Sequence, residues 1–151
     1  MRFVYIFARK IRSFAAIPLP DKLLFGEAFL LSAYVKCTML FLPFSKVKRW
    51  LGKPITVNEE SGITENKELA IKVREAVKLC NKYAPWPTEC YTRALTAKIM
   101  LRRRNMNGTL NFGFYRKEDG EMLAHAWLHS NGMLITGFCD FTKYETHSSF
   151  N

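Results

Sequence analysis

The feature that most constrains the fold of this chain is a change in hydrophobic period near Asn107-Gly108. Before this point, apolar residues recur every three to four positions, which is typical of amphipathic helices. After it, apolar and polar residues alternate, which is typical of strands with one buried face. Helices followed by antiparallel hairpins predict an α+β fold.

Three stretches have the helical period. Residues 21–42 begin with Asp21 as the expected N-cap, and residues 65–83 carry one clear apolar stripe. Two prolines end the second stretch, and the third, residues 88–104, begins with Thr88 as its expected N-cap. The sequence therefore predicts a helical first part in which each helix has a recognisable boundary.

Three strands are predicted after the helices, at residues 109–115, 121–129 and 133–136. A turn at residues 117–120 joins the first two, and Asn131-Gly132 is a typical tight hairpin turn between the last two. The remaining tail has only weak signals. The three strands predict an antiparallel meander.

The chain divides by composition into two regions that we expect to form one compact unit. Residues 1–52 form an N-terminal helical region, which includes a short basic helix at 45–51. Residues 53–64 are polar and rich in turn residues, so they are interpreted as a linker. Residues 65–151 are expected to form the core.

The net charge of +10 favours an acidic partner, such as nucleic acid, an anionic membrane or an acidic peptide. Aromatic and basic residues are poorly interleaved on the predicted strands, so we expect no nucleic-acid partner. Residues 1–17 are basic and amphipathic, which also suits peripheral membrane contact. An alternative function is a non-enzymatic basic binding module that uses residues 1–17, 46–53 and 102–104.

The longest apolar stretch, Leu23 to Phe44, is interrupted by Glu27 and Lys36. We interpret it as a buried or interfacial helix and not as a membrane span. No secretory signal is evident at the start of the chain. Reduced thiols and a cytoplasmic location are therefore expected.

Four cysteines, Cys37, Cys80, Cys90 and Cys139, have no CxxC spacing, so neither a disulfide framework nor a structural zinc site is expected. Phosphate-binding loops, dinucleotide fingerprints and HExxH motifs do not occur in the sequence. We therefore expect no cofactor and no metal.

Cys90 is the best candidate nucleophile. It lies in the first turn of the third predicted helix, where free N–H groups and the positive end of the dipole favour a thiolate. His125, in the middle of a predicted strand, is the candidate base, because thiol enzymes pair such residues across the fold. Candidates for the group that orients this imidazole are Asp140, Glu145 and Asn131.

These residues lie in a longer pattern. Residues 86–95, Trp-Pro-Thr-Glu-Cys-Tyr-Thr-Arg-Ala-Leu, precede residues 124–128, Ala-His-Ala-Trp-Leu, and then Ile135-Thr136-Gly137. The pattern resembles the stand-alone transglutaminase-like cysteine peptidase of lasso peptide biosynthesis. The similarity covers about residues 10–145. It implies N-terminal helices followed by a transglutaminase/papain-like core of a helix and an antiparallel sheet.

The resemblance also implies a function. Such peptidases remove the leader from a ribosomally made precursor peptide, and a separate asparagine-synthetase-like cyclase then closes the ring on the freed amine. A small leader-recognition protein delivers the precursor to the stand-alone form. The family's nucleophile matches Cys90 and its base matches His125. An alternative on the same scaffold is acyl transfer to an amine instead of water.

The family's third catalytic group does not match this chain directly. A carboxylate is expected about a dozen residues after the histidine, where this chain has Thr136-Gly137. Asp140 is the nearest acidic residue and is therefore the expected third catalytic residue.

Overall fold

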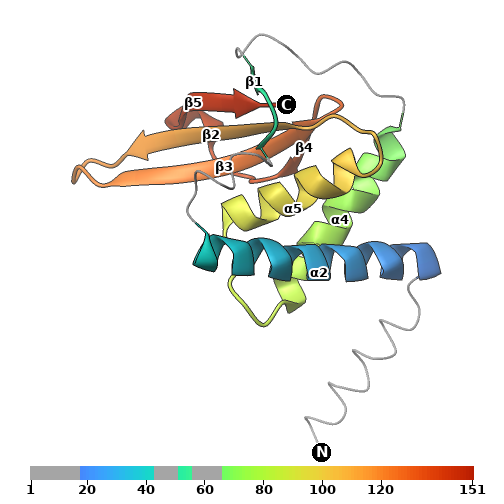
Figure 1. Cartoon of the computed structure of the whole chain (residues 1–151). Helices are drawn as coiled ribbons and strands as arrows, with labels where there is room; N and C mark the ends of the chain where they lie inside the picture. The colour runs from blue at the N-terminus through green and yellow to red at the C-terminus, as the bar shows by residue number, and fades with distance from the viewer. Residues whose placement is uncertain (1–17, 43–50, 56–65) are drawn as a thin grey trace, which may run out of the picture.

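The computed structural model describes residues 18–42, 51–55 and 66–151. Helices α2, α4 and α5 gather on one side of an antiparallel sheet (Figure 1). This confirms the predicted α+β class. The helices are α2 (Leu19–Phe41), α4 (Lys67–Tyr83) and α5 (Cys90–Arg102), and the other elements are β1 (Pro54–Ile55), β2 (Thr109–Arg116), β3 (Met122–Ser130), β4 (Met133–Thr136), η1 (Phe141–Lys143) and β5 (Glu145–Phe150).

Helix α2 begins earlier than predicted. Its N-cap is Pro18, whose carbonyl accepts hydrogen bonds from the N–H groups of Asp21 and Lys22, so Asp21 as the cap was wrong. Proline suits this position because the first N–H groups of a helix have no intrahelical acceptor. Asp21 lies in the first turn instead, where its charge favours the helix dipole.

Among the described residues, α2 is the one helix long and apolar enough to cross a membrane by length and composition. One side of it is packed inside the protein: Ala28 and Val35 are fully buried. Arg103, after the end of α5, pairs with Glu27 of α2 at 3.1 Å, and Arg104 pairs with the same carboxylate. The basic run at the end of α5 therefore helps to hold these two helices together.

Helices α4 and α5 follow the predictions closely, apart from one cap. Asn66 caps α4 by accepting a hydrogen bond from Leu69 N at 3.2 Å. The N-cap of α5 is Glu89, so the prediction of Thr88 was wrong. The Thr88 hydroxyl donates to the Asn81 side chain instead and is not available to the helix.

The predicted hairpins are present within one residue at each end. Strands β2, β3 and β4 pair in an antiparallel meander, and the sheet order is β1-β5-β2-β3-β4. Asn131 and Gly132 have φ angles of 53° and 69°. Two successive residues with a left-handed backbone conformation form a turn whose twist matches the right-handed twist of the strands it joins.

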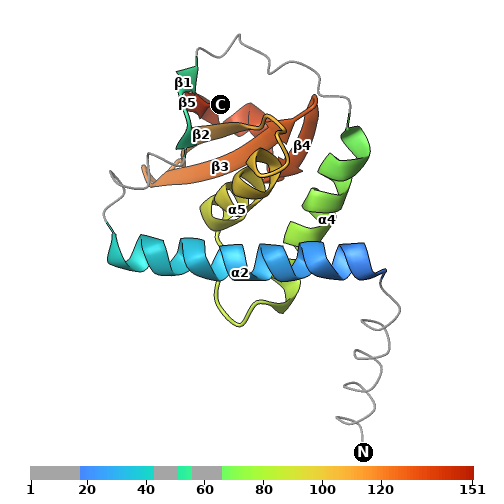
Figure 2. The same cartoon turned by 45° about the vertical axis from the view of Figure 1, so that its right-hand side comes forward.

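The outer part of the sheet was not predicted. After β4 the chain crosses to the other side of β2, where β5 pairs with β2 and with β1 (Figure 2). Strand β1 lies inside the predicted linker of residues 53–64, of which residues 56–64 are outside the described residues. The predicted segments 1–17 and 45–50 also lie outside the described residues.

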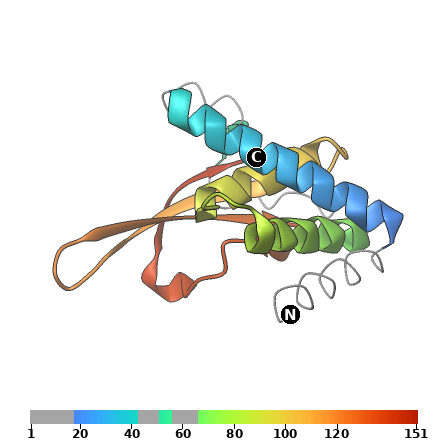
Figure 3. The same ribbon diagram turned by 90° about the horizontal axis from the view of Figure 1, so that it is seen from below.

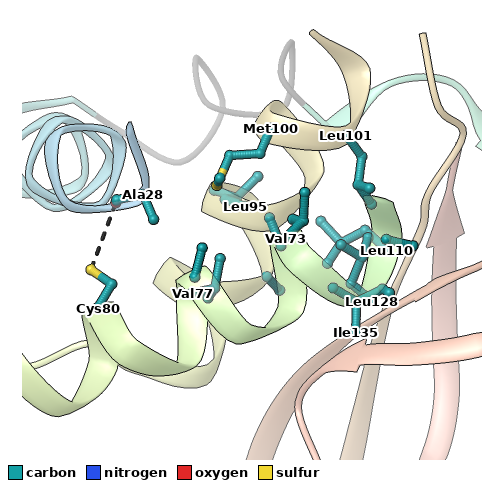
Figure 4. Packing of buried hydrophobic residues seen from close by; sticks show 14 of the residues in the cluster. Ala28, Val73, Val77, Cys80, Leu95, Met100, Leu101, Leu110, Leu128 and Ile135 are labelled. Atoms are coloured by element: carbon teal, nitrogen blue, oxygen red, sulfur yellow. Dashed lines mark hydrogen bonds between the residues drawn. The ribbon is translucent and has the colours of Figure 1, made fainter. Parts of the chain in front are cut away.

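The core lies between the helices and the sheet (Figure 4). Leu95, Met100 and Leu101 of α5 are fully buried against α4 and against strand residues such as Leu128. Lys98 is buried on the same helix and donates hydrogen bonds to Gly108 O at 2.7 Å and Phe150 O at 3.1 Å. Burial lowers the pKa of Lys98 to about 8. Helix α5 is thus surrounded by protein along most of its length.

This packing predicts a large difference between two equivalent helix substitutions. Leu101→Ala removes a side chain with 0% exposure, so it should lower the free energy of unfolding by about 2–5 kcal/mol. Leu30→Ala, on α2 with 72% exposure, is the matched control and should cost less than about 0.5 kcal/mol. Urea denaturation measures both, and equal losses would contradict the core described above.

Candidate active site

Cys90 is the first residue of α5 and is half-buried. The two prolines after α4 force the chain out of one helix before the next can begin. The start of α5 has no side-chain cap. Its first-turn N–H groups have no acceptor inside the helix, so the positive end of the helix dipole lies at Cys90 and favours negative charge there.

Helix α2 contacts the segment between α4 and α5 that leads to Cys90. Trp86 Nε1 donates to Ser32 Oγ at 3.1 Å, and Lys36 Nζ pairs with Glu89 Oε1 at 2.6 Å. The hydrogen bond from Lys36 is the main reason that the pKa of Glu89 is lowered. Because Lys36 neutralises this carboxylate, Glu89 opposes a Cys90 thiolate less than an unpaired carboxylate would. The N-terminal region is thus part of the scaffold of the site.

His125 lies on β3, on the face of the sheet that points away from the helices. Ala126 and Leu128 belong to the core under α5, and alternate residues of a strand point to opposite faces. The ring of His125 stacks on Trp127 with 6.1 Å between centroids and lies 5.3 Å from the ring of Tyr144. These aromatic neighbours restrict the rotation of the imidazole.

The imidazole is oriented by a backbone carbonyl. His125 Nε2 lies 3.1 Å from Gly137 O. A carbonyl oxygen can only accept, so Nε2 carries the proton and Nδ1 is left as the basic nitrogen. Nδ1 has no hydrogen-bond partner in the described part of the chain. It is the atom that can take a proton from a thiol.

Gly137 holds this carbonyl in a position that other residues could not adopt easily. Its φ is +83°, and a Cβ there would lie 2.5 Å from Ala126 O and 2.6 Å from Trp127 Cβ. Gly137 directly follows β4, and the chain begins to cross beneath the sheet there. The crossing segment leads to η1, which Figure 3 shows on the opposite side of the β2–β3 hairpin from α2. Gly137 comes twelve residues after His125, where the family pattern would have a carboxylate.

Asp140 makes its contacts elsewhere. Its Oδ1 accepts from the Thr142 hydroxyl at 2.6 Å, and its Oδ2 lies 3.4 Å from Lys143 Nζ. The hydrogen bond from the Thr142 side chain is the main reason that the pKa of Asp140 is lowered. No contact joins Asp140 to His125 in the described structure. Asp140 as the third catalytic residue stays a prediction, and the observed partner of the imidazole is the Gly137 carbonyl.

The two alternatives for this role, Glu145 and Asn131, take no part in the hydrogen bond and ring contacts of His125 described above. Glu145 is exposed on β5, where it is paired with Phe114 of β2. Asn131 lies in the turn between β3 and β4. Sequence reasoning could not find Gly137, because a backbone acceptor has no side-chain signature.

The segment from Gly137 to Cys139 connects the two candidate residues. Burial, and then the charges of Asp140 and Cys90, raise the pKa of Cys139, so its thiol is close enough to Cys90 to interact electrostatically. Gly137 bonds to His125 at the other end of this segment. No hydrogen bond joins Cys90 to His125 directly among the described residues. Thiol and imidazole thus both lie beside this short segment.

Two other observations complete the site. His129 is half-buried, with its Nδ1 3.4 Å from Asn111 Nδ2, and burial lowers the pKa of its ring. No group of three or more His, Cys, Asp or Glu residues that could hold a metal ion occurs within residues 18–42, 51–55 and 66–151. Cys90 and His125 offer the chemistry of a thiol and an imidazole.

The Gly137 contact predicts a specific signal for His125. With ¹⁵N-labelled histidine, the Hε2 proton of His125 should be resolved and exchange slowly, because the carbonyl holds it. Asp140→Asn should leave this signal unchanged, and exposed His147 is the internal control for fast exchange. Loss or a large shift of the signal in Asp140→Asn would assign the orienting role to Asp140 instead.

Comparison with known proteins shows the family of the chain. No curated protein and no solved structure is similar enough to count as a match. The sequence pattern of the transglutaminase-like superfamily matches residues 38–149, which is most of the chain and includes Cys90 and His125. The chain belongs to the transglutaminase-like superfamily, which includes cysteine peptidases and acyltransferases.

Proposed function

We propose that this chain is a cysteine peptidase that removes the leader from a lasso peptide precursor. The observation that carries the proposal is Cys90 at the uncapped start of a buried helix. The strand that packs against this helix carries His125 on its other face, where the Gly137 carbonyl orients the imidazole. The Ala-His-Ala-Trp-Leu run at residues 124–128 and the Cys90 region resemble this group of peptidases in particular.

The first chemical step is attack of the Cys90 thiolate on the carbonyl carbon between leader and core. A C–S bond forms and the carbonyl oxygen becomes negative. The N–H groups of the first turn of α5 have no side-chain cap, so they are available to stabilise the oxyanion. His125 then gives a proton to the leaving amine as the C–N bond breaks, which releases the core peptide.

The second step returns the enzyme to its starting state. The leader is now held on Cys90 as a thioester. His125 takes a proton from water through Nδ1, and the resulting hydroxide attacks the thioester. A C–O bond forms and the C–S bond breaks, which releases the leader acid and restores the Cys90 thiolate beside the protonated imidazole. The Gly137 carbonyl stabilises the charged ring through Nε2 during both steps. For these transfers Nδ1 must come within hydrogen-bonding distance of Cys90 Sγ. Because His125 lies on the sheet face away from α5, the proposal requires the imidazole to move toward Cys90 when the peptide binds.

Two partners follow from this proposal. The described elements are three helices and one sheet, all used for the core and the scaffold of the site, so a small recognition protein would deliver the leader. An asparagine-synthetase-like cyclase would then use the freed amine. The exposed apolar side chains on the outer face of α2, such as Leu23, Leu30 and Leu40, are candidates for these contacts.

Substitution of Cys90 tests the proposal. With precursor peptide and recognition protein, the wild-type chain should release a leader acid and a core with a free amine, detected by mass spectrometry. Cys90→Ala should abolish release, since no other group can form the thioester. Cys37→Ser, an exposed cysteine on α2, is the matched control and should cleave at the wild-type rate.

The product masses separate the alternatives. Release of the core by Cys90→Ala at the wild-type rate would refute the thiol mechanism and favour a basic binding module. A leader joined to an added amine would indicate acyl transfer instead of hydrolysis. Equal rates with and without the recognition protein would mean that this chain reads the leader itself.

A further inference from the structure

A pocket of about 400 Å³ lies beside the candidate active site. It is formed by one side of α4, the first turns of α5 and the end of β4; Figure 2 shows α4 and β4 side by side. Its wall is apolar at Val77, Ile135 and Phe138. The rest of the wall is mostly polar and carries several charges.

The charge of the wall is predominantly positive. The wall carries three cationic side chains, Arg74, Lys78 and Arg93, and one carboxylate, Glu75. That carboxylate is already shared: Glu75 Oε1 lies 3.4 Å from Arg74 Nε, and Oε2 lies 3.6 Å from Lys78 Nζ. The Arg93 guanidinium has no ion-pair partner among the described residues. The pocket thus has unpaired positive charge at Arg93.

Two buried polar atoms of the wall also have no partner. Arg93 Nε and Thr136 Oγ1 are shielded from solvent and make no hydrogen bond to the described residues. Leaving a buried donor unmet costs about 1–3 kcal/mol, so such atoms usually have an acceptor when the protein works. Both atoms can donate to an anion. A carboxylate suits a guanidinium particularly well because its two oxygens match the fork of N–H groups.

The pocket adjoins the catalytic pair on two sides. Arg93 is one helical turn after Cys90, which places their Cβ atoms about 5–6 Å apart. Gly137, whose carbonyl bonds to His125, is also part of the pocket wall. An extended peptide advances about 3.3–3.6 Å per residue. In a peptide whose scissile bond lies at Cys90, the side chain of the residue next to that bond can therefore reach Arg93.

We propose that this pocket is a substrate subsite that binds an acidic side chain, Asp or Glu, next to the cleaved bond of the peptide. The inference rests on the proposed function, because it needs a peptide held at Cys90. Arg93 binds the carboxylate, the Thr136 hydroxyl donates to it, and Val77 and Ile135 contact the methylene groups. The subsite would select a precursor by charge in addition to any selection by a partner.

Chloroacetyl-Glu-Ala-amide and chloroacetyl-Gln-Ala-amide test the subsite without requiring cleavage. Cys90 sulfur displaces chloride from either probe, forming a C–S bond, and peptide mapping gives the labelling rate. The Glu probe should label Cys90 about tenfold faster than the Gln probe, which corresponds to about 1.4 kcal/mol. Arg93→Gln should remove this preference, and Arg93→Lys should keep part of it.

Arg102→Gln is the matched control, because it removes one charge from the exposed far end of the same helix. It should keep the preference, which separates the pocket from general attraction by a chain of net charge +10. Equal labelling by both probes would overturn the subsite while the role of Cys90 stands. Absence of labelling at Cys90 would overturn both. Protection by inorganic phosphate but not by acetate would show a phosphate site and overturn the carboxylate assignment.

Discussion

The packing of α5 between the other helices and the sheet is the constraint on which the rest of the structure depends. Leu95, Met100 and Leu101 are buried along the helix, and Lys98 is bonded to two strand-side carbonyls. A helix held in this way cannot rotate or slide without exposing core. Its first residue, Cys90, therefore has a defined position, and the free N–H groups around it have a defined direction. Catalysis by oriented dipoles requires this rigidity.

The second constraint is the path of the chain after β4. Gly137 passes so close to β3 that a Cβ would collide with the Ala126 carbonyl. The close approach brings the Gly137 carbonyl to His125, and the chain then crosses beneath the sheet to form β5 next to β2. One glycine thus links the topology of the sheet to the orientation of the imidazole. It also contributes to the wall of the cationic pocket.

Sequence reasoning was sufficient where the signal is local. The apolar stripe of residues 65–83, the alternation on both sides of Asn131-Gly132 and the proline pair before Cys90 are each produced by neighbouring residues. It failed for β5, because Glu145, His147 and their neighbours are polar and become a strand only through pairing with β2. The cap at Thr88 was wrong because a tertiary contact with Asn81 takes its hydroxyl. The pocket at Arg93 is equally invisible in sequence, since α4 and β4 form it together.

A leader peptide activated as a C-terminal thioester tests the central claim, that Cys90 and His125 perform acyl chemistry, most directly. Such a substrate transfers its acyl group to a thiol without acid assistance to the leaving group, so His125 is then needed only to activate water. The wild-type chain should hydrolyse the thioester, and His125→Ala should accumulate the leader as an adduct that peptide mapping assigns to Cys90. Hydrolysis at the wild-type rate by Cys90→Ala, or an adduct on another residue, would contradict the account.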